Sequence, residues 1–144
     1  MKLLLDEDVP LPLLELLRHV LADHEVDHVY GVQWKGKQDR DLYRDSRRRG
    51  YDAVLTNNLR QLNDPDECTA IKKSGVHLIL YETPDGLRGL ALASAAICAA
   101  IRPLVGRLVT RDRQHIARIR SISPTVERFT LVDPALDPPS PYWP

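Results

Sequence analysis

Three short runs of apolar residues constrain the fold of this chain more than any other feature of its sequence. They cover residues 2–6, 51–56 and 76–81, and each lacks the polar–apolar alternation of a strand with one face in water. Strands of this kind are buried on both faces, which is typical of parallel sheets covered by helices. We therefore expect an α/β fold, a three-layer α/β/α domain with a mainly parallel central sheet.

The segments between these strands look helical. Apolar residues at helical spacing, or helix-forming composition closed by a glycine, predict helices at residues 13–21, 39–49, 68–74 and 87–108. Pro103 should kink or split the last of these. A further strand is expected at 25–30. Beyond residue 110 the pattern weakens, and we expect a short helix at 112–119 and a strand at 128–132.

A length of 144 residues suits one domain with one core. We place this domain at residues 1–132 and interpret 133–144, which hold five of the eleven prolines, as an extended tail. The first apolar run is only three residues long, so no signal peptide is expected. The longest uncharged run, 89–101, is shorter than the roughly 20 residues of a membrane span. With two distant cysteines and no CxxC pair, a reducing cytoplasm and no membrane are expected.

Charge is distributed unevenly, although the formal net charge is zero. Residues 1–85 carry a net charge of −4, and residues 86–131 carry +6. An acidic half joined to an arginine-rich half suits a metal-dependent enzyme acting on a polyanion, but ordinary solvated helix faces would give the same pattern. If the ligand is RNA, its phosphates should run over Arg44, Arg47, Arg48 and Arg49 and over arginines of residues 102–120.

The acids that follow the first strand are the strongest candidates for a site. Asp6 and Asp8 lie two positions apart, so both can face one side while Glu7 points elsewhere. A carboxylate beside a core is costly unless its charge is compensated, and a divalent cation would compensate it. Alternatively, Asp8 caps the helix that begins near Pro10.

Further polar residues should meet these acids at the same edge of the sheet. Asp39 opens a predicted helix, as its N-cap or as a second carboxylate for Mg²⁺ or Mn²⁺. Thr56, Asn57 and Asn58 end a strand, where they could contact a phosphate or simply form the turn. Three later acids could complete a metal site or begin a helix: Asp64, Asp66 and Glu67.

Other chemistries have little support. The GxxxxGK[ST], GxGxxG, GxSxG and HExxH patterns do not occur in the sequence. His24 and His28 could share a strand face, but no third ligand lies at a matching spacing for zinc.

The order of these features resembles the PIN-like domains, especially VapC-type toxins and the Mut7-C-like group. LLLDEDVP, an acid opening a helix, and AVLTNN carry the resemblance, which covers roughly residues 2–82. It implies that Asp6, Asp39 and Thr56 are catalytic residues and that Asn58 stands where the family has an aspartate. Asp6, Asp8 and Asp39 would then bind Mg²⁺ or Mn²⁺.

The resemblance implies a ribonuclease that uses metal-activated water, the toxin of a toxin–antitoxin pair. Its partners would be RNA and a cognate antitoxin. Separately, the tail carries Tyr142 and Trp143, which could contact a second copy of the chain or the partner, or fold back on the chain's own core. Because Asn58 carries no charge, a weak or inactive module that binds RNA or a protein is the main alternative. A haloacid-dehalogenase-like phosphatase lacks its second motif here, and a response-regulator receiver lacks its phosphoacceptor, since Thr56 ends the third strand.

Overall fold

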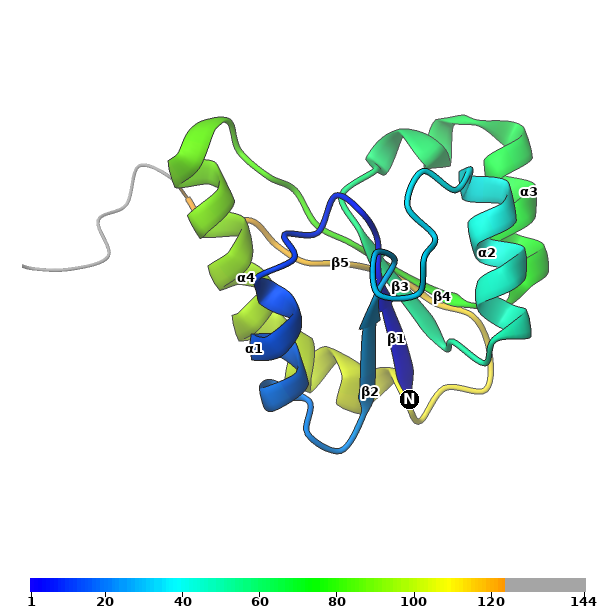
Figure 1. Ribbon diagram of the computed structural model, residues 1–144, viewed down its shortest axis with the longest axis horizontal. Coiled ribbons are helices and arrows are strands. Elements are labelled where there is room, and N and C mark those ends of the chain that lie inside the picture. The colour runs from blue at the N-terminus through cyan, green and yellow to red at the C-terminus, as the bar shows by residue number, and fades with distance from the viewer. Residues whose placement is uncertain (124–144) are drawn as a thin grey trace, which may run out of the picture.

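The computed structural model describes residues 1–123 and shows an α/β fold built on a five-stranded, all-parallel sheet (Figure 1). The strands are β1 (Lys2–Leu5), β2 (Glu25–His28), β3 (Ala53–Thr56), β4 (His77–Leu80) and β5 (Ile116–Arg118). Their order across the sheet is β2-β1-β3-β4-β5. Every neighbouring pair is parallel, so the carboxyl ends of all five strands lie along one edge.

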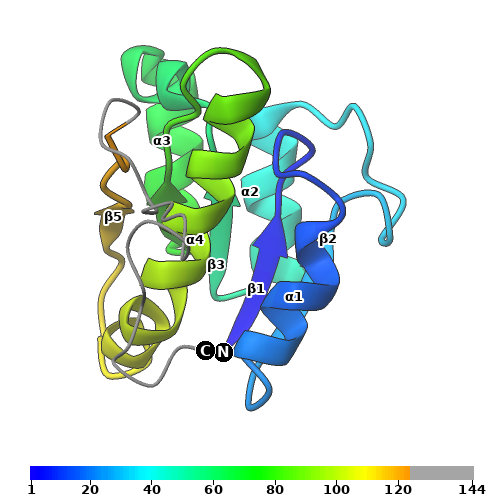
Figure 2. The same ribbon diagram turned by 90° about the vertical axis from the view of Figure 1, so that its left-hand side faces the viewer.

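Helices cover both faces of this sheet, as expected. The chain forms α1 (Leu13–Val20), α2 (Asp39–Arg48), the 3₁₀ helix η1 (Leu59–Asn63), α3 (Pro65–Ser74) and α4 (Gly86–Leu108). α1 and α4 lie on one face, and α2 and α3 lie on the other (Figures 1 and 2). The prediction of an α/β fold with a parallel sheet is confirmed.

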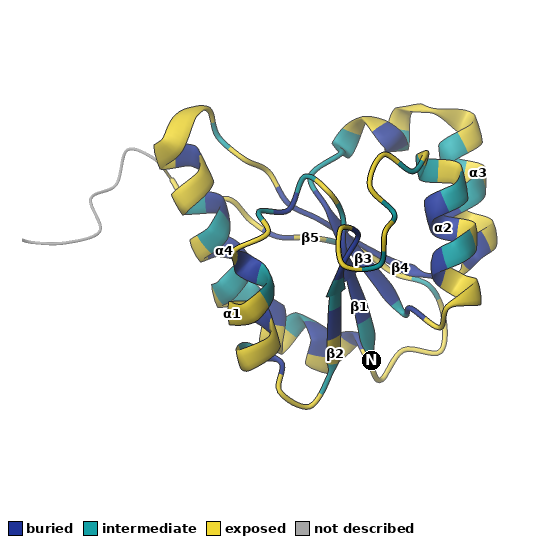
Figure 3. Ribbon diagram, viewed as in Figure 1, coloured by how far each residue is buried: buried dark blue, intermediate teal, exposed yellow. Residues whose placement is uncertain are grey.

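The core has two halves because side chains of a strand alternate between the faces of the sheet. Leu3 and Leu5 of β1 pack with α1 and α4, whereas Leu4 packs with α2 and α3. All residues of β3 and β4 are buried (Figure 3). This two-sided burial explains why their sequences show no alternation.

Three sequence expectations differ from the structure. Residues 112–119 form no helix: β5 pairs with the open edge of β4, where Leu78 N–H donates to His115 O at 3.1 Å. α3 begins at Pro65, earlier than expected, because the Asp64 carboxylate caps it. α4 continues through Pro103 as one helix. The predicted strand at 128–132 and the tail at 133–144 lie outside the described residues.

The connection from β4 to β5 has the opposite hand to the others. The connection from β1 to β2 and the connection from β4 to β5 cross the sheet in opposite directions, yet their helices, α1 and α4, lie on the same face. Parallel crossovers are right-handed in nearly all proteins. The unit with the opposite hand consists of β4, α4 and β5. It contains the longest helix, α4, and ends in an edge strand, β5, of only three residues.

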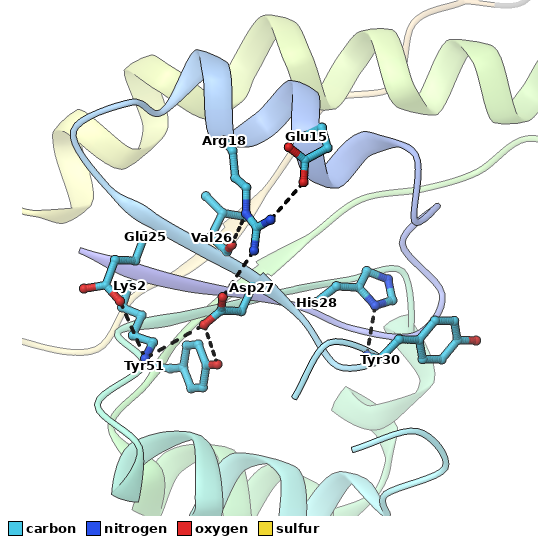
Figure 4. A network of polar contacts seen from close by, with 9 residues as sticks. All are labelled: Lys2, Glu15, Arg18, Glu25, Val26, Asp27, His28, Tyr30 and Tyr51. Atoms are coloured by element: carbon cyan, nitrogen blue, oxygen red, sulfur yellow. Dashed lines mark hydrogen bonds and ion pairs between the residues drawn. The ribbon is translucent and has the colours of Figure 1, made fainter. Parts of the chain in front are cut away.

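A network of partly exposed polar groups holds the other edge strand, β2 (Figure 4). The Tyr51 hydroxyl donates to Asp27 at 2.8 Å, and Lys2 and Arg18 approach the same carboxylate at 3.8 Å and 3.5 Å. Arg18 also donates to the carbonyl of Val26 at 2.9 Å. Burial raises the pKa of the Tyr51 phenol, and the hydrogen bond to the Asp27 carboxylate raises it further. Together these contacts tie β2 to α1 and to the start of β3.

Among residues 1–123, α4 alone is long and apolar enough to cross a membrane by length and composition. The core helix of a soluble protein satisfies the same criterion. In this fold, Ile97, Ile101 and Val105 of α4 are buried against the sheet.

Candidate functional site

The strand order creates a crevice between the carboxyl ends of β1 and β3. The chain leaves β1 toward β2 on one side and leaves β3 toward β4 on the other. In open α/β sheets, ligands bind at such switch points. Asp6 and Asp8 follow β1, and Asn57 and Asn58 follow β3, so the two predicted groups of polar residues meet here.

These residues line a pocket of about 530 Å³, which we call the acid pocket. Its lining consists of Asp6, Glu7, Asp8, Lys37, Asp39, Asn57, Asn58, Leu59 and Arg60. Asp39 reaches the pocket as the first residue of α2, whose N-cap is Gln38. Glu7 lines the pocket as well, with its carboxylate accepting from Gly36 N–H at 3.0 Å, so the expectation that Glu7 points elsewhere is wrong.

Asp8 is the most firmly oriented of the acids. The Thr56 hydroxyl donates to Asp8 Oδ2 at 3.0 Å, and Asn57 N–H donates to Oδ1 and Oδ2 at 3.1 Å and 3.2 Å. The Tyr81 hydroxyl donates to the backbone carbonyl of Asp8 at 2.9 Å. α1 has Pro12 at its N-cap and no side-chain cap, so Asp8 does not cap a helix. It joins β1, β3 and β4 instead.

Asn58 contacts the second element of the pocket. Its side-chain amide donates to Asp39 Oδ2 at 2.9 Å, and its backbone N–H donates to the Thr56 hydroxyl at 3.1 Å. Asn58 is therefore fixed between β3 and α2. A neutral donor at this point satisfies one carboxylate oxygen of Asp39 without adding charge.

Of the three later acids, only Glu67 lies beside the acid pocket. Burial and the neighbouring Asp39 carboxylate raise the pKa of Glu67. Asp64 caps α3 by accepting from the N–H groups of Asp66 and Glu67 at 2.8 Å and 3.0 Å. Asp66 is exposed and lies 3.5 Å from Arg40.

Burial and mutual repulsion disfavour the charged forms of the carboxylates in the acid pocket. Burial raises the pKa of Asp6. Burial and the negative charge of Asp6 raise the pKa of Asp8 to about 6, and the same two causes raise that of Asp39. None of the ion pairs within residues 1–123 involves these three acids, and Lys37 pairs with Asp45 at 2.7 Å. The lining of the pocket thus carries four carboxylates against the two cations Lys37 and Arg60, and Asp6, Asp8 and Asp39 form no ion pair within the described residues.

The donor set fits a hard divalent cation in chemistry. No three His, Cys, Asp or Glu side chains in the described part of the chain are arranged to hold a metal ion by themselves. Mg²⁺ is commonly held by one or two carboxylates, with water and substrate phosphates completing its shell. Two carboxylates from different elements, Asp6 and Asp39, meet that smaller requirement.

The histidines have structural contacts. His28 Nε2 lies 2.9 Å from the carbonyl oxygen of Val9, and His24 Nδ1 lies 3.2 Å from the amino group of Met1. The two rings serve different parts of the fold.

The predicted RNA-binding arginines lie outside the acid pocket. Arg44, Arg47 and Arg48 line a separate groove between α2 and α3. Arg49 lies over the ring of Trp34 at 4.8 Å. Sequence reasoning missed Lys37 and Arg60 as lining residues of the acid pocket, because both come from irregular or 3₁₀ segments whose direction no periodicity predicts.

Beneath the acid pocket lies a buried polar pair that the sequence analysis also missed. The Tyr43 hydroxyl donates to Gln61 Oε1 at 2.8 Å, and Gln61 Nε2 has no partner in the described structure. Burial, together with the charges of Asp6 and Asp39, raises the pKa of Tyr43.

No protein-family model matches this chain, and no curated protein and no solved structure is significantly similar to it.

Proposed function

We propose that this protein is a metal-dependent ribonuclease with a PIN-like, three-layer α/β/α domain, and that the acid pocket is its cleavage site. The observation that carries the proposal is the meeting of Asp6, Asp8 and Asp39 at the switch point, where none of the three forms an ion pair within residues 1–123. Buried carboxylates in such an arrangement are costly unless a ligand compensates them. A binding site explains why the fold retains them.

Each residue has a role in this proposal. Asp6 and Asp39 would hold Mg²⁺ or Mn²⁺, and Asp8, fixed by Thr56 and Asn57, would contact the same ion or its water. A bound divalent ion lowers the pKa of its water and stabilises charge on phosphoryl oxygens. Thr56 aligns Asp8, and Asn58 aligns Asp39.

The resemblance in sequence extends the proposal to biology. A cytoplasmic ribonuclease toxin would be silenced by a cognate antitoxin, and a second copy of the chain could pair with the first. The antitoxin rests on the resemblance of LLLDEDVP and AVLTNN to the PIN-like pattern, and the second copy rests on the apolar Tyr142 and Trp143 in the sequence of the tail.

Asn58 favours a second candidate, a weak or inactive module that binds RNA or a protein. Its amide occupies one oxygen of Asp39 where the family pattern has an acid. Fewer charges lower the affinity for a cation. The rate of cleavage distinguishes the two candidates.

Cleavage of labelled single-stranded RNA with Mn²⁺ tests the proposal. The wild type should cut slowly, and EDTA or Asp6→Ala should abolish cutting. Asn58→Asp should increase the rate if an acid at this position adds a ligand. Absence of cleavage by both the wild type and Asn58→Asp on diverse RNAs, with RNA binding retained, would support the inactive module.

A further inference from the structure

The groove between α2 and α3 shares no lining residue with the acid pocket and is strongly basic. It has a volume of about 490 Å³. Its lining consists of Arg40, Arg44, Arg47, Arg48, Asp66, Thr69, Ala70, Lys73 and Ser74. Five of these side chains are cationic, and one is acidic.

The cations of α2 form a continuous stripe. Arg40, Arg44 and Arg47 follow one another at intervals of four and three residues, so they share one helix face. At a rise of about 1.5 Å per residue, this stripe is about 10 Å long. Lys73 extends the basic lining on the opposite wall, near the end of α3.

Local interactions account for only part of this concentration of charge, although Arg48, in the last turn of α2, lies 3.7 Å from Asp45. Cations stabilise the last turn of a helix, which explains Arg47 and Lys73, but Arg40 is in the first turn of α2, where the helix dipole disfavours it. Arg44 pairs with Asp41 and Asp45. Within residues 1–123, Arg47 and Lys73 make no ion pair, and Arg40 lies 3.5 Å from an exposed Asp66, a contact of little energy.

The groove and the acid pocket meet at the beginnings of α2 and α3. Asp39 lines the acid pocket, and the next residue, Arg40, lines the groove. On α3, Glu67 lies beside Asp39, and Asp66 faces the groove. A polyanion with one phosphate at the acid pocket would therefore have its next phosphates in the groove.

We infer that the groove between α2 and α3 binds the sugar–phosphate backbone of single-stranded RNA on one side of the acid pocket. This inference rests on the proposed function, because it takes RNA as the ligand of both sites. Guanidinium groups match phosphate oxygens in pairs, and the length of the stripe suits more than one phosphate. Backbone contacts of this kind position the strand without reading its sequence.

Two pairs of exposed residues provide matched variants. Lys72 and Lys73 share the last turn of α3, but only Lys73 lines the groove. Arg47 of α2 and Arg88 of α4 lie on helices that cover opposite faces of the sheet (Figure 1), and Arg88 lines neither the groove nor the acid pocket. Replacing each with Ser removes one charge. Urea midpoints equal to that of the wild type would show that folding is unaffected.

Binding of a fluorescent single-stranded RNA is measured by anisotropy in EDTA, over a range of salt concentrations. Lys73→Ser and Arg47→Ser should weaken binding several-fold and reduce the log–log salt slope by about 0.7 each. Lys72→Ser and Arg88→Ser should leave the slope unchanged. Equal slopes for Lys73→Ser and Lys72→Ser, and for Arg47→Ser and Arg88→Ser, would overturn the inference.

The outcomes separate this inference from the proposed function. Groove variants that lose RNA binding support the groove even if no RNA is ever cut. Metal-dependent cleavage that depends on Asp6 but is accompanied by unchanged binding in the groove variants would support the catalytic site and overturn the groove. Salt-dependent binding of polyglutamate that Lys73→Ser weakens, without RNA binding, would assign the groove to an acidic protein and also overturn the inference.

Discussion

Replacing Asp8 with Asn should stabilise the protein at neutral pH when no divalent ion is present. The pKa of Asp8 is raised from 3.8 to about 6, chiefly by burial and then by the negative charge of Asp6. The difference between these values corresponds to about 3 kcal/mol. Asp8 keeps some access to solvent, and screening reduces the expected effect to about 1–2 kcal/mol. An Asn oxygen can still accept from Asn57 N–H, so most of the local bonding survives.

The sign of the pH dependence follows from the direction of the shift. A carboxyl whose pKa is higher in the folded state binds a proton more readily there, so the wild type loses stability as the pH rises from 3.8 to about 6. Asp8→Asn removes this loss. The difference in unfolding free energy between variant and wild type should therefore grow by about 1–2 kcal/mol from pH 4 to pH 8.

Urea denaturation followed by circular dichroism, in EDTA and at several pH values, measures this difference. Asp112→Asn is the matched control, because Asp112 is exposed and its variant should show no comparable trend. Destabilisation by Asp8→Asn at pH 8, or a difference that stays constant across the pH range, would refute the reasoning that the acid pocket stores unfavourable charge.

Three further substitutions test the account of the fold. Asp64→Ala should lower the unfolding free energy by about 1 kcal/mol, because it removes the cap of α3, and an unchanged urea midpoint would argue against that role. Gly89→Ala should lower the melting temperature sharply, since a Cβ would lie 1.6 Å from the carbonyl oxygen of Pro84; normal stability would mean that this contact relaxes easily. His77 Nδ1 accepts from His115 N–H at 2.9 Å, and burial lowers the pKa of His77. The stabilisation that neutral His77 gives the folded state is therefore complete above the unfolded pKa of about 6.5. It is lost as the pH falls through the lower pKa of the folded state. His77→Asn, which retains an acceptor, should lose less unfolding free energy than the wild type between pH 7 and pH 5, and identical losses would contradict this contact.

The buried strands were predictable because burial on both faces leaves a simple sequence signal. β1, β3 and β4 all lie within the predicted runs of Leu, Val and Ile. β5 was not predictable in the same way, since Ile116 and Arg118 are exposed and the strand depends on pairing with β4. Tertiary hydrogen bonds, rather than local propensity, determine its conformation.

The candidate site was predictable to the extent that strand ends determine it. Thr56 ends a parallel strand, and Asp6, Asp8 and Asn58 follow parallel strands, so their meeting follows from topology. The sequence left open whether Asp8 caps a helix, and only the contacts with Thr56 and Asn57 exclude that role. The choice of Glu67 over its neighbours depends on how α3 packs against α2, which no spacing in the sequence reveals.

Calorimetric titration of Mn²⁺ into the wild type and Asp6→Asn tests the central claim, that the acid pocket binds a divalent cation, most directly. The wild type should bind Mn²⁺ at one site, and Asp6→Asn should bind at least about tenfold more weakly, since it removes a negatively charged ligand. Asp112→Asn, at an exposed position away from the acid pocket, should bind like the wild type. Equal affinities for the wild type and Asp6→Asn would contradict the account.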